Sequence, residues 1–259
     1  MMDCQTEYVL PNKHIVENSS MRQVMRRLGQ LIVILGLWVI SSFGLVACQQ
    51  ASTDKPSTTK QEQTPPLPAR VNAKAPVVVF LGDSLTAGFN LSPEDALPEQ
   101  VSRRLNEAGQ AVNVINAGVS GDTSANGLSR YDWSVKSVNP NFLIVALGAN
   151  DYLQNVPPER VRANLSEILS KAQADNISVI LIGLKIRSKA EAEAGSRDAD
   201  YGTIYPELAS QFDVPLYPAL LEGVRNNPKL LQSDGLHPTA KGVEVMADGL
   251  SDFLKPLIK

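Results

Sequence analysis

The chain has 259 residues, 43% of them hydrophobic, which is enough to bury one sizeable core. Its formal net charge of -3 and pI of about 5.5 argue against a nucleic-acid partner, because such proteins carry a basic footprint. The chain has only two histidines, His14 and His237, and two cysteines, which excludes a histidine-rich or thiolate metal site. We therefore expect neither a metal nor a cofactor.

Residues 1–47 have the pattern of a secretory signal. Three arginines precede an apolar run over 31–46, and small residues follow directly before Cys48. A basic region, an apolar region and small residues in this order predict export and removal of the segment. The alternative is a retained membrane-spanning helix, but a span needs about 20 apolar residues, and serines and a glycine interrupt this shorter run. Residues 1–20 add nothing to such a signal, so initiation at Met21 or Met25 stays open.

The signal ends in Leu45-Val46-Ala47-Cys48, which resembles a bacterial lipobox. In a lipobox the cysteine sulfur receives a diacylglycerol and the cysteine becomes the new N-terminus, so we expect a lipid-anchored protein of the cell envelope. Gln49 stands where inner-membrane retention is associated with aspartate, so the resemblance favours the outer membrane, with the protein facing the periplasm. Cys4 would leave with the signal, so no intrachain disulfide is expected.

Residues 48–75 predict a lipidated cysteine followed by a flexible tether. From residue 49 onward the composition is dominated by Gln, Ser, Thr, Pro and Lys, without an aromatic residue. Such a segment cannot bury enough apolar surface to offset its ordering entropy. A single globular domain is expected over 76–259.

Strand-like and helix-like segments alternate along this domain. Short apolar runs predict strands at 77–81, 112–115, 142–147, 179–183 and 214–217. Amphipathic patterns predict helices at 98–108, 158–174 and 239–257. Thr239 is a plausible N-cap of the last helix. The alternation predicts an α/β fold with a mostly parallel sheet covered by helices on both faces.

The first predicted strand leads directly into Gly82-Asp83-Ser84. A buried parallel strand delivers its last side chains to the carboxyl edge of the sheet, where ligands usually bind. We interpret Ser84, presented there, as a nucleophile. The G-x-S-x-G elbow of α/β-hydrolases is not matched, because Thr86 stands in place of the second glycine.

His237 is the histidine available to activate this serine, since His14 lies in the segment expected to be removed. It belongs to Asp234-Gly235-Leu236-His237-Pro238, so the Asp234 carboxylate can fold back onto the imidazole. A carboxylate bonded to one ring nitrogen leaves the other to take a proton from a serine hydroxyl. The alternative, a surface histidine that caps the turn, is weakened by the presence of Ser84.

Two turns rich in small and polar residues follow the second and third predicted strands. Gly118 lies in the first, and Asn150 lies in the second, Gly148-Ala149-Asn150-Asp151. A glycine lets a backbone N–H approach a ligand, and an asparagine amide is a neutral donor suited to a developing oxyanion. For either turn taken alone, ordinary turn chemistry is the better explanation.

Together, four blocks resemble the SGNH (GDSL) hydrolase family: Gly82-Asp83-Ser84-Leu85-Thr86, Gly118, Gly148-Ala149-Asn150-Asp151 and Asp234-Gly235-Leu236-His237-Pro238. Four blocks in order are far more specific than any one. Segments 120–124 and 212–216 are similar to the bacterial branch of multifunctional thioesterases, lysophospholipases and arylesterases.

This resemblance implies a three-layer α/β/α sandwich with a five-stranded parallel sheet. It also implies a catalytic triad of Ser84, Asp234 and His237. The implied oxyanion donors are the backbone N–H groups of Ser84 and Gly118 and the side chain of Asn150.

The expected activity is hydrolysis of carboxylic esters or thioesters of acyl groups through an acyl-enzyme, by a monomer acting on a small acyl ester or lysophospholipid. An O-acetyl esterase acting on envelope polysaccharide is the alternative enzyme, and an inactive envelope-binding lipoprotein is the alternative without catalysis. The charged segment 185–198 departs from the branch, where a short loop over the acyl site is expected. It is either a solvated insertion or a determinant of acyl-chain selection.

Overall fold

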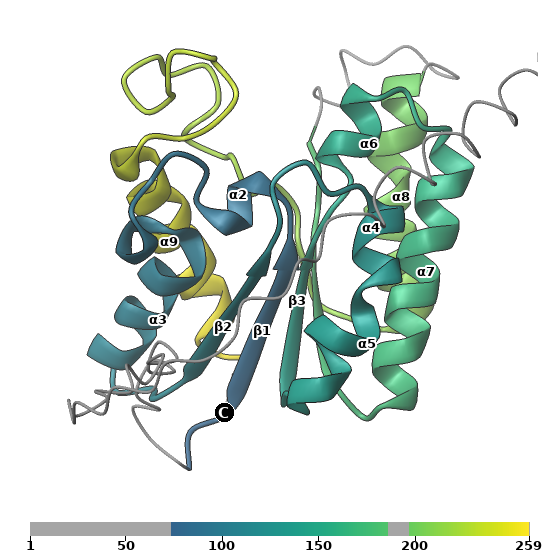
Figure 1. Ribbon diagram of the computed structural model, residues 1–259, viewed down its shortest axis with the longest axis horizontal. Helices are drawn as coiled ribbons and strands as arrows, with labels where there is room; N and C mark the ends of the chain where they lie inside the picture. Colours follow the sequence, from purple (N-terminus) through teal and green to yellow (C-terminus); the bar gives the residue numbers. More distant parts are fainter. Residues whose placement is uncertain (1–73, 186–196, 259) are drawn as a thin grey trace, which may run out of the picture. The chain divides into compact units, whose positions relative to one another are not determined.

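Five parallel strands form one sheet in the order β2-β1-β3-β4-β5 (Figure 1). The computed structural model describes residues 74–185 and 197–258. Its strands are β1 (Val77–Gly82), β2 (Asn113–Gly118), β3 (Phe142–Ala146), β4 (Ser178–Ile182) and β5 (Leu216–Tyr217). Each predicted strand is present, although β2 extends to Gly118 and β5 is shorter than expected. The predictions for residues 1–73, and for most of the charged segment, lie outside the described residues.

Helices cover both faces of this sheet. They are α2 (Ser84–Ala87), α3 (Leu97–Glu107), α4 (Ser124–Ser129), α5 (Tyr131–Ser134), α6 (Ala149–Leu153), α7 (Pro158–Ala174), α8 (Arg197–Phe212) and α9 (Ala240–Leu254), with 3-10 turns η1 (Pro93–Asp95) and η2 (Lys136–Val138). In Figure 1, α3 and α9 lie on one side of the sheet, and α4, α5, α7 and α8 lie on the other. The predicted three-layer α/β/α sandwich is therefore confirmed.

The interior strand β1, which lies between β2 and β3, shows why the sheet needs two helical layers. Val78 and Phe80 pack into the core on the α3 and α9 side, whereas Val79 and Leu81 pack into the core on the α7 and α8 side. Successive strand residues point to opposite faces, so a strand that is apolar at every position must be buried on both. This run places the end of β1, and the residues that follow it, at the carboxyl edge of the sheet between the ends of β2 and β3.

The predicted amphipathic helices fold as their patterns require. The buried residues of α7 recur at the expected helical spacing, and are Val161, Leu165, Ile168, Leu169 and Ala172. Thr239 caps α9 as expected, since its side chain accepts a hydrogen bond from the backbone N–H of Gly242 at 3.2 Å. Within residues 74–185 and 197–258, no helix is long and apolar enough to cross a membrane.

Candidate active site

Ser84 lies at the junction of β1 and the short helix α2. Asp83 is the N-cap of α2, and its carboxylate accepts a hydrogen bond from the backbone N–H of Leu85 at 3.0 Å. The turn before it requires glycine, because a Cβ on Gly82 would lie 2.0 Å from the Thr86 hydroxyl. The strand β1, the Asp83 cap and the helix α2 together hold Ser84 at the carboxyl end of β1, where the sequence predicted it.

A chain of hydrogen bonds connects Ser84, His237 and Asp234. His237 Nε2 lies 2.8 Å from Ser84 Oγ, and His237 Nδ1 lies 2.7 Å from Asp234 Oδ2. Because an ionised carboxylate only accepts, Nδ1 carries the proton facing Asp234, and Nε2 is left to accept from the serine hydroxyl. The three residues predicted as a triad are thus brought together in the order that proton transfer requires.

Asp234 also organises the loop that carries His237. Its Oδ1 accepts the backbone N–H groups of His237 at 3.0 Å and of Leu236 at 2.9 Å. These backbone bonds, together with the bond to the imidazole, lower the pKa of Asp234 to about 2. The carboxylate is therefore ionised throughout the neutral range and holds the imidazole ring in one orientation.

Two further residues that sequence reasoning missed support His237. The Phe89 ring lies over the imidazole, with ring centroids 4.4 Å apart. The Gln232 amide donates to the carbonyls of Phe89 at 2.9 Å and Pro238 at 2.8 Å. Gln232 therefore connects the segment after α2 to the loop that carries His237. Gln232 and Phe89 lie 143 positions apart, so no local sequence pattern predicts this contact.

The predicted oxyanion donors do not all remain available. Within the described residues, Ser84 N–H has no hydrogen-bond acceptor. Asn150, in the first turn of α6, donates one amide hydrogen to the carbonyl of Asp122 at 3.0 Å, which leaves its second hydrogen for a ligand. Gly118 N–H, in contrast, already donates to Asn116 Oδ1 at 3.0 Å.

Gly118 has a packing role, since a Cβ there would lie 2.3 Å from the backbone nitrogen of Ala87 in α2. Three residues later, Gly121 occupies a turn closed by the bond from Asp122 N–H to Val119 O at 3.1 Å. Its φ of +89° favours glycine, and its N–H has no acceptor within the described residues. The positive φ of Gly121 distinguishes it from Gly118, and sequence reasoning missed Gly121 because a backbone angle cannot be read from the sequence.

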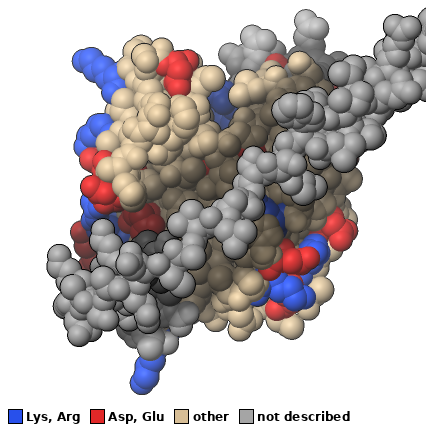
Figure 2. Space-filling model, in the orientation of Figure 1, with Lys and Arg blue, Asp and Glu red and all other residues tan. Residues whose placement is uncertain are grey.

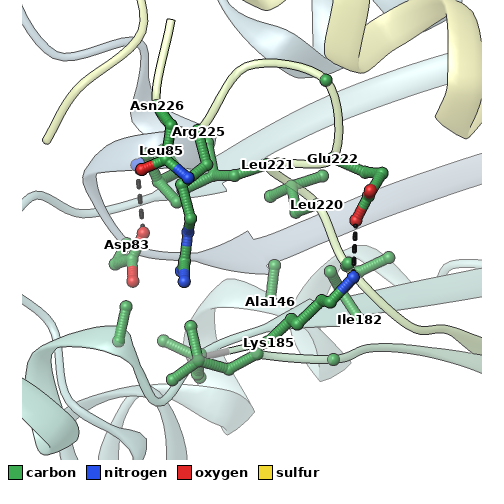
Figure 3. A pocket seen from close by; sticks show the side chains of 16 residues that line it. Asp83, Leu85, Ala146, Ile182, Lys185, Leu220, Leu221, Glu222, Arg225 and Asn226 are labelled. Atoms are coloured by element: carbon green, nitrogen blue, oxygen red, sulfur yellow. Dashed lines mark hydrogen bonds and ion pairs between the residues drawn. The ribbon is translucent and has the colours of Figure 1, made fainter. Parts of the chain in front are cut away.

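A pocket of about 590 Å³ lies beside Ser84, because Asp83 and Leu85, its neighbours in the chain, line it (Figure 3). Its lining includes the ends of β3 and β4, the residues beside Ser84 and the segment 219–226 that follows β5. Most of the lining is aliphatic, and Lys185 pairs with Glu222 at 3.1 Å at its margin. A cavity of this size and composition is typical of small-molecule sites.

Two charged side chains, those of Asp83 and Arg225, project into the pocket in Figure 3. Asp83 is only 3% exposed, and burial raises its pKa from 3.8 to about 6. Sequence reasoning treated Asp83 only as part of the strand-end motif and missed its place in the pocket wall.

Comparison with known proteins identifies the class of protein that this fold and site define. The GDSL-like Lipase/Acylhydrolase family profile matches residues 80–245, which is most of the domain. The chain belongs to this family of ester-cleaving hydrolases, as its four sequence blocks predicted.

Particular relatives narrow the position of the chain within the family. It is 36% identical to "Thioesterase 1/protease 1/lysophospholipase L1" of Escherichia coli (strain K12) over 188 residues, covering 72% of this chain and 86% of that protein. It is also 36% identical to "Arylesterase" of Vibrio mimicus, covering 68% of this chain and 87% of the relative. "Uncharacterized lipoprotein YqeF" of Bacillus subtilis (strain 168) is 26% identical, covering 68% of this chain and 88% of the relative.

Solved structures agree with these relatives. The crystal structure of AlinE4, described as an SGNH-hydrolase family esterase, superimposes with a TM-score of 0.58 at 36% identity. The match covers 73% of this chain and 99% of that one.

Proposed function

We propose that this protein is a serine esterase that hydrolyses carboxylic esters or thioesters of acyl groups through a covalent acyl-enzyme. The observation that carries the proposal is the hydrogen-bonded chain from Ser84 Oγ through His237 to Asp234, with distances of 2.8 and 2.7 Å. Ser84 is the nucleophile, His237 is the general base and acid, and Asp234 orients the imidazole.

The reaction begins when Ser84 Oγ attacks the acyl carbon and its proton passes to His237 Nε2. The tetrahedral intermediate collapses as the imidazolium returns that proton to the departing alcohol or thiol, leaving the acyl group on Ser84. A water molecule then attacks the acyl carbon while His237 takes its proton. Collapse of the second intermediate releases the carboxylic acid and returns the proton to Ser84 Oγ.

Three donors are proposed for the oxyanion that forms in both steps. They are the Ser84 N–H, the second amide hydrogen of Asn150, and the Gly121 N–H in place of that of Gly118. The pairing of Gly118 N–H with Asn116 supports this exchange. The bond from Asn150 to the carbonyl of Asp122, the residue after Gly121, supports a shared location for the last two donors.

Apolar surroundings support an acyl group as the substrate. The segments that carry the site residues also expose large apolar side chains, namely Phe89, Val119, Leu153 and Leu236. Figure 2 shows a tan surface of uncharged residues over the loops at the upper left, with basic and acidic side chains at its edges and further charged side chains at the lower left and lower right. The relatives' names, thioesterase, lysophospholipase and arylesterase, are consistent with substrates that carry an apolar acyl chain.

The location proposed for the protein is the cell envelope, with a lipid on Cys48 and outer-membrane sorting. The lipobox-like sequence supports it, and one relative is named a lipoprotein. Globomycin treatment of cells tests the anchor: a larger precursor is expected to accumulate, and an unchanged mobility on a gel would refute lipid processing at Cys48.

The activity is tested with p-nitrophenyl esters from acetyl to palmitoyl, using the full chain purified in mild detergent and its Ser84→Ala variant. Serine-dependent hydrolysis of medium or long chains is the expected result. Activity confined to the acetyl ester would favour an O-acetyl esterase, and equal activity of both proteins on every ester would refute the proposal.

A further inference from the structure

A buried arginine, Arg130, connects segments that are distant in the sequence. Its side chain, between α4 and α5, is 7% exposed. Nε donates to Asp122 Oδ2 at 2.6 Å, Nη1 donates to Ser134 Oγ at 3.1 Å, and Nη2 donates to the carbonyl of Gly82 at 3.0 Å. All three guanidinium nitrogens therefore have an acceptor, and these acceptors lie at the end of β1, in the loop after β2 and in α5.

The first of these acceptors belongs to the nucleophile strand. Gly82 ends β1 two residues before Ser84, and its carbonyl also accepts the backbone N–H of Val119 at 3.0 Å. Val119 begins the turn that contains Gly121. The Gly82 carbonyl thus belongs to the strand that leads to Ser84. It contacts both the turn that carries Gly121 and the guanidinium group of Arg130.

The second acceptor belongs to the residue that contacts Asn150. Asp122 binds Arg130 through its carboxylate and Asn150 through its backbone carbonyl. The ion pair that fixes Asp122 therefore also fixes the acceptor that orients the Asn150 amide. Arg130 is therefore bonded directly to the segments that carry Ser84 and Gly121, and it is connected to the Asn150 amide through Asp122.

We propose that Arg130 is a positioning residue that holds the N–H groups of Ser84 and Gly121 and the amide of Asn150 in register around the oxyanion. This inference rests on the proposed esterase function. A planar guanidinium fixes several acceptors in one geometry, whereas a lysine ammonium is a point charge on a flexible stem. Preorganised donors stabilise the transition state only where they are correctly placed, and a displacement of about 1 Å costs about 100-fold in rate.

The alternative is a buried ion pair that contributes to folding alone. Removing one partner of such a pair destabilises the fold because the other charge is left unpaired. Arg130→Lys separates the two roles, since it keeps a positive charge beside Asp122 and removes the fork. Arg104→Lys is a matched control, because Arg104 on α3 also uses all three nitrogens, binding Asp248 at 2.5 Å, Gln100 O at 3.0 Å and Glu244 O at 3.1 Å.

The first measurement compares kcat and KM of both variants on a p-nitrophenyl ester, using the full chain and correcting for the folded fraction. Arg130→Lys is expected to lower kcat by about 10-fold or more with little change in KM, because the donors act mainly in the transition state. Binding of a trifluoromethyl ketone, which forms a tetrahedral adduct with the serine, is expected to weaken by a similar factor. Arg104→Lys is expected to change neither quantity.

The second measurement repeats Arg130→Lys in the Asn150→Ala background. If Arg130 acts by placing the Asn150 amide, its effect on kcat shrinks to about 3-fold or less once that amide is absent, because coupled residues are not additive. Should Arg130→Lys fail to fold, Asp122→Asn takes its place, since the asparagine still offers an oxygen to Arg130 Nε. An undiminished effect in the Asn150→Ala background would overturn the positioning of the Asn150 amide by Arg130. A kcat equal to that of Arg104→Lys would overturn the inference as a whole.

Ser84→Ala, measured in the same assay, distinguishes a failure of the proposed esterase mechanism from a failure of the positioning role of Arg130. An active Ser84→Ala protein refutes the esterase mechanism itself. An inactive Ser84→Ala protein, with an Arg130→Lys variant that behaves like the control, refutes only the positioning role.

Discussion

Burial of the Asp83 carboxyl group makes the free energy of unfolding decrease as the pH rises. Burial raises the pKa of Asp83 from 3.8 in the unfolded chain to about 6 in the fold, so the folded state binds more protons between these two values. Stability contributed by the protonated carboxyl is therefore complete below pH 3.8 and is lost as the pH rises through about 6. The shift corresponds to about 3 kcal/mol, because one pKa unit is worth about 1.4 kcal/mol.

Asp83→Asn removes this ionisation while keeping an oxygen that accepts the Leu85 N–H at the helix cap. Relative to the parent protein, the variant is expected to gain about 2 kcal/mol in free energy of unfolding as the pH rises from 4 to 8, because part of the Asp83 contribution is already lost at pH 4. Urea unfolding at several pH values, followed by circular dichroism, measures the difference directly. Taking the difference between two proteins cancels the titration of the groups that do not interact with Asp83, whereas His237 and Asp122 are coupled to it.

The control is Asp252→Asn, because the Asp252 side chain is 74% exposed. Its difference from the parent is expected to stay within about 0.5 kcal/mol at every pH. If the difference in free energy of unfolding between Asp83→Asn and the parent is the same at pH 4 and pH 8, ionisation of Asp83 does not destabilise the fold. That result would refute the predicted effect of burial on Asp83.

Three further predictions concern the site and its packing. Asn150→Ala is expected to lower kcat by about 100-fold or more, since it removes one oxyanion donor, and near-parental turnover on a p-nitrophenyl ester would exclude that role. Asp234→Asn is expected to lower kcat by about 1,000-fold or more, because the amide no longer fixes the imidazole tautomer; stopped-flow acylation rates measure this, and a loss confined to deacylation would contradict it. Gly118→Ala is expected to destabilise the fold by about 2 kcal/mol or more, because its Cβ would lie 2.3 Å from the Ala87 nitrogen. Thermal unfolding measures this change, with Gly202→Ala as the matched control. A Cβ at Gly202 meets nothing within 4 Å in α8, so the control is expected to stabilise the fold by about 0.5 to 1 kcal/mol.

The local part of the site was readable from the sequence because its contacts span few residues. Asp234 and His237 are three positions apart, so the motif itself places the carboxylate beside the ring. Ser84 follows an uninterrupted apolar strand, and the carboxyl end of a buried parallel strand has one location in this architecture. The family blocks added the pairing of Ser84 with His237, which lie 153 positions apart.

The choice between Gly118 and Gly121 as the proposed oxyanion donor shows which information the motif lacks. Two glycines lie in the same short segment, and both satisfy a pattern that asks only for a glycine after the second strand. One packs its Cα against α2 and has its N–H paired with Asn116, whereas the other has a positive φ and an unpaired N–H within the described residues. Backbone angles and hydrogen-bond partners separate these two roles, and neither is written in the residue type.

The sequence by itself determined the five strands, the helices α3, α7 and α9, the burial of the sheet on both faces, and the His237 loop, because periodicity and short-range hydrogen bonding are local properties. The 16-residue helix α8 was not predicted. The tertiary structure alone decided the rest. The pocket wall combines Asp83 with the segment 219–226, and the Arg130 fork joins the end of β1 to the loop after β2. Such contacts depend on how the layers pack, and a buried polar group acquires its partners only when distant segments close around it.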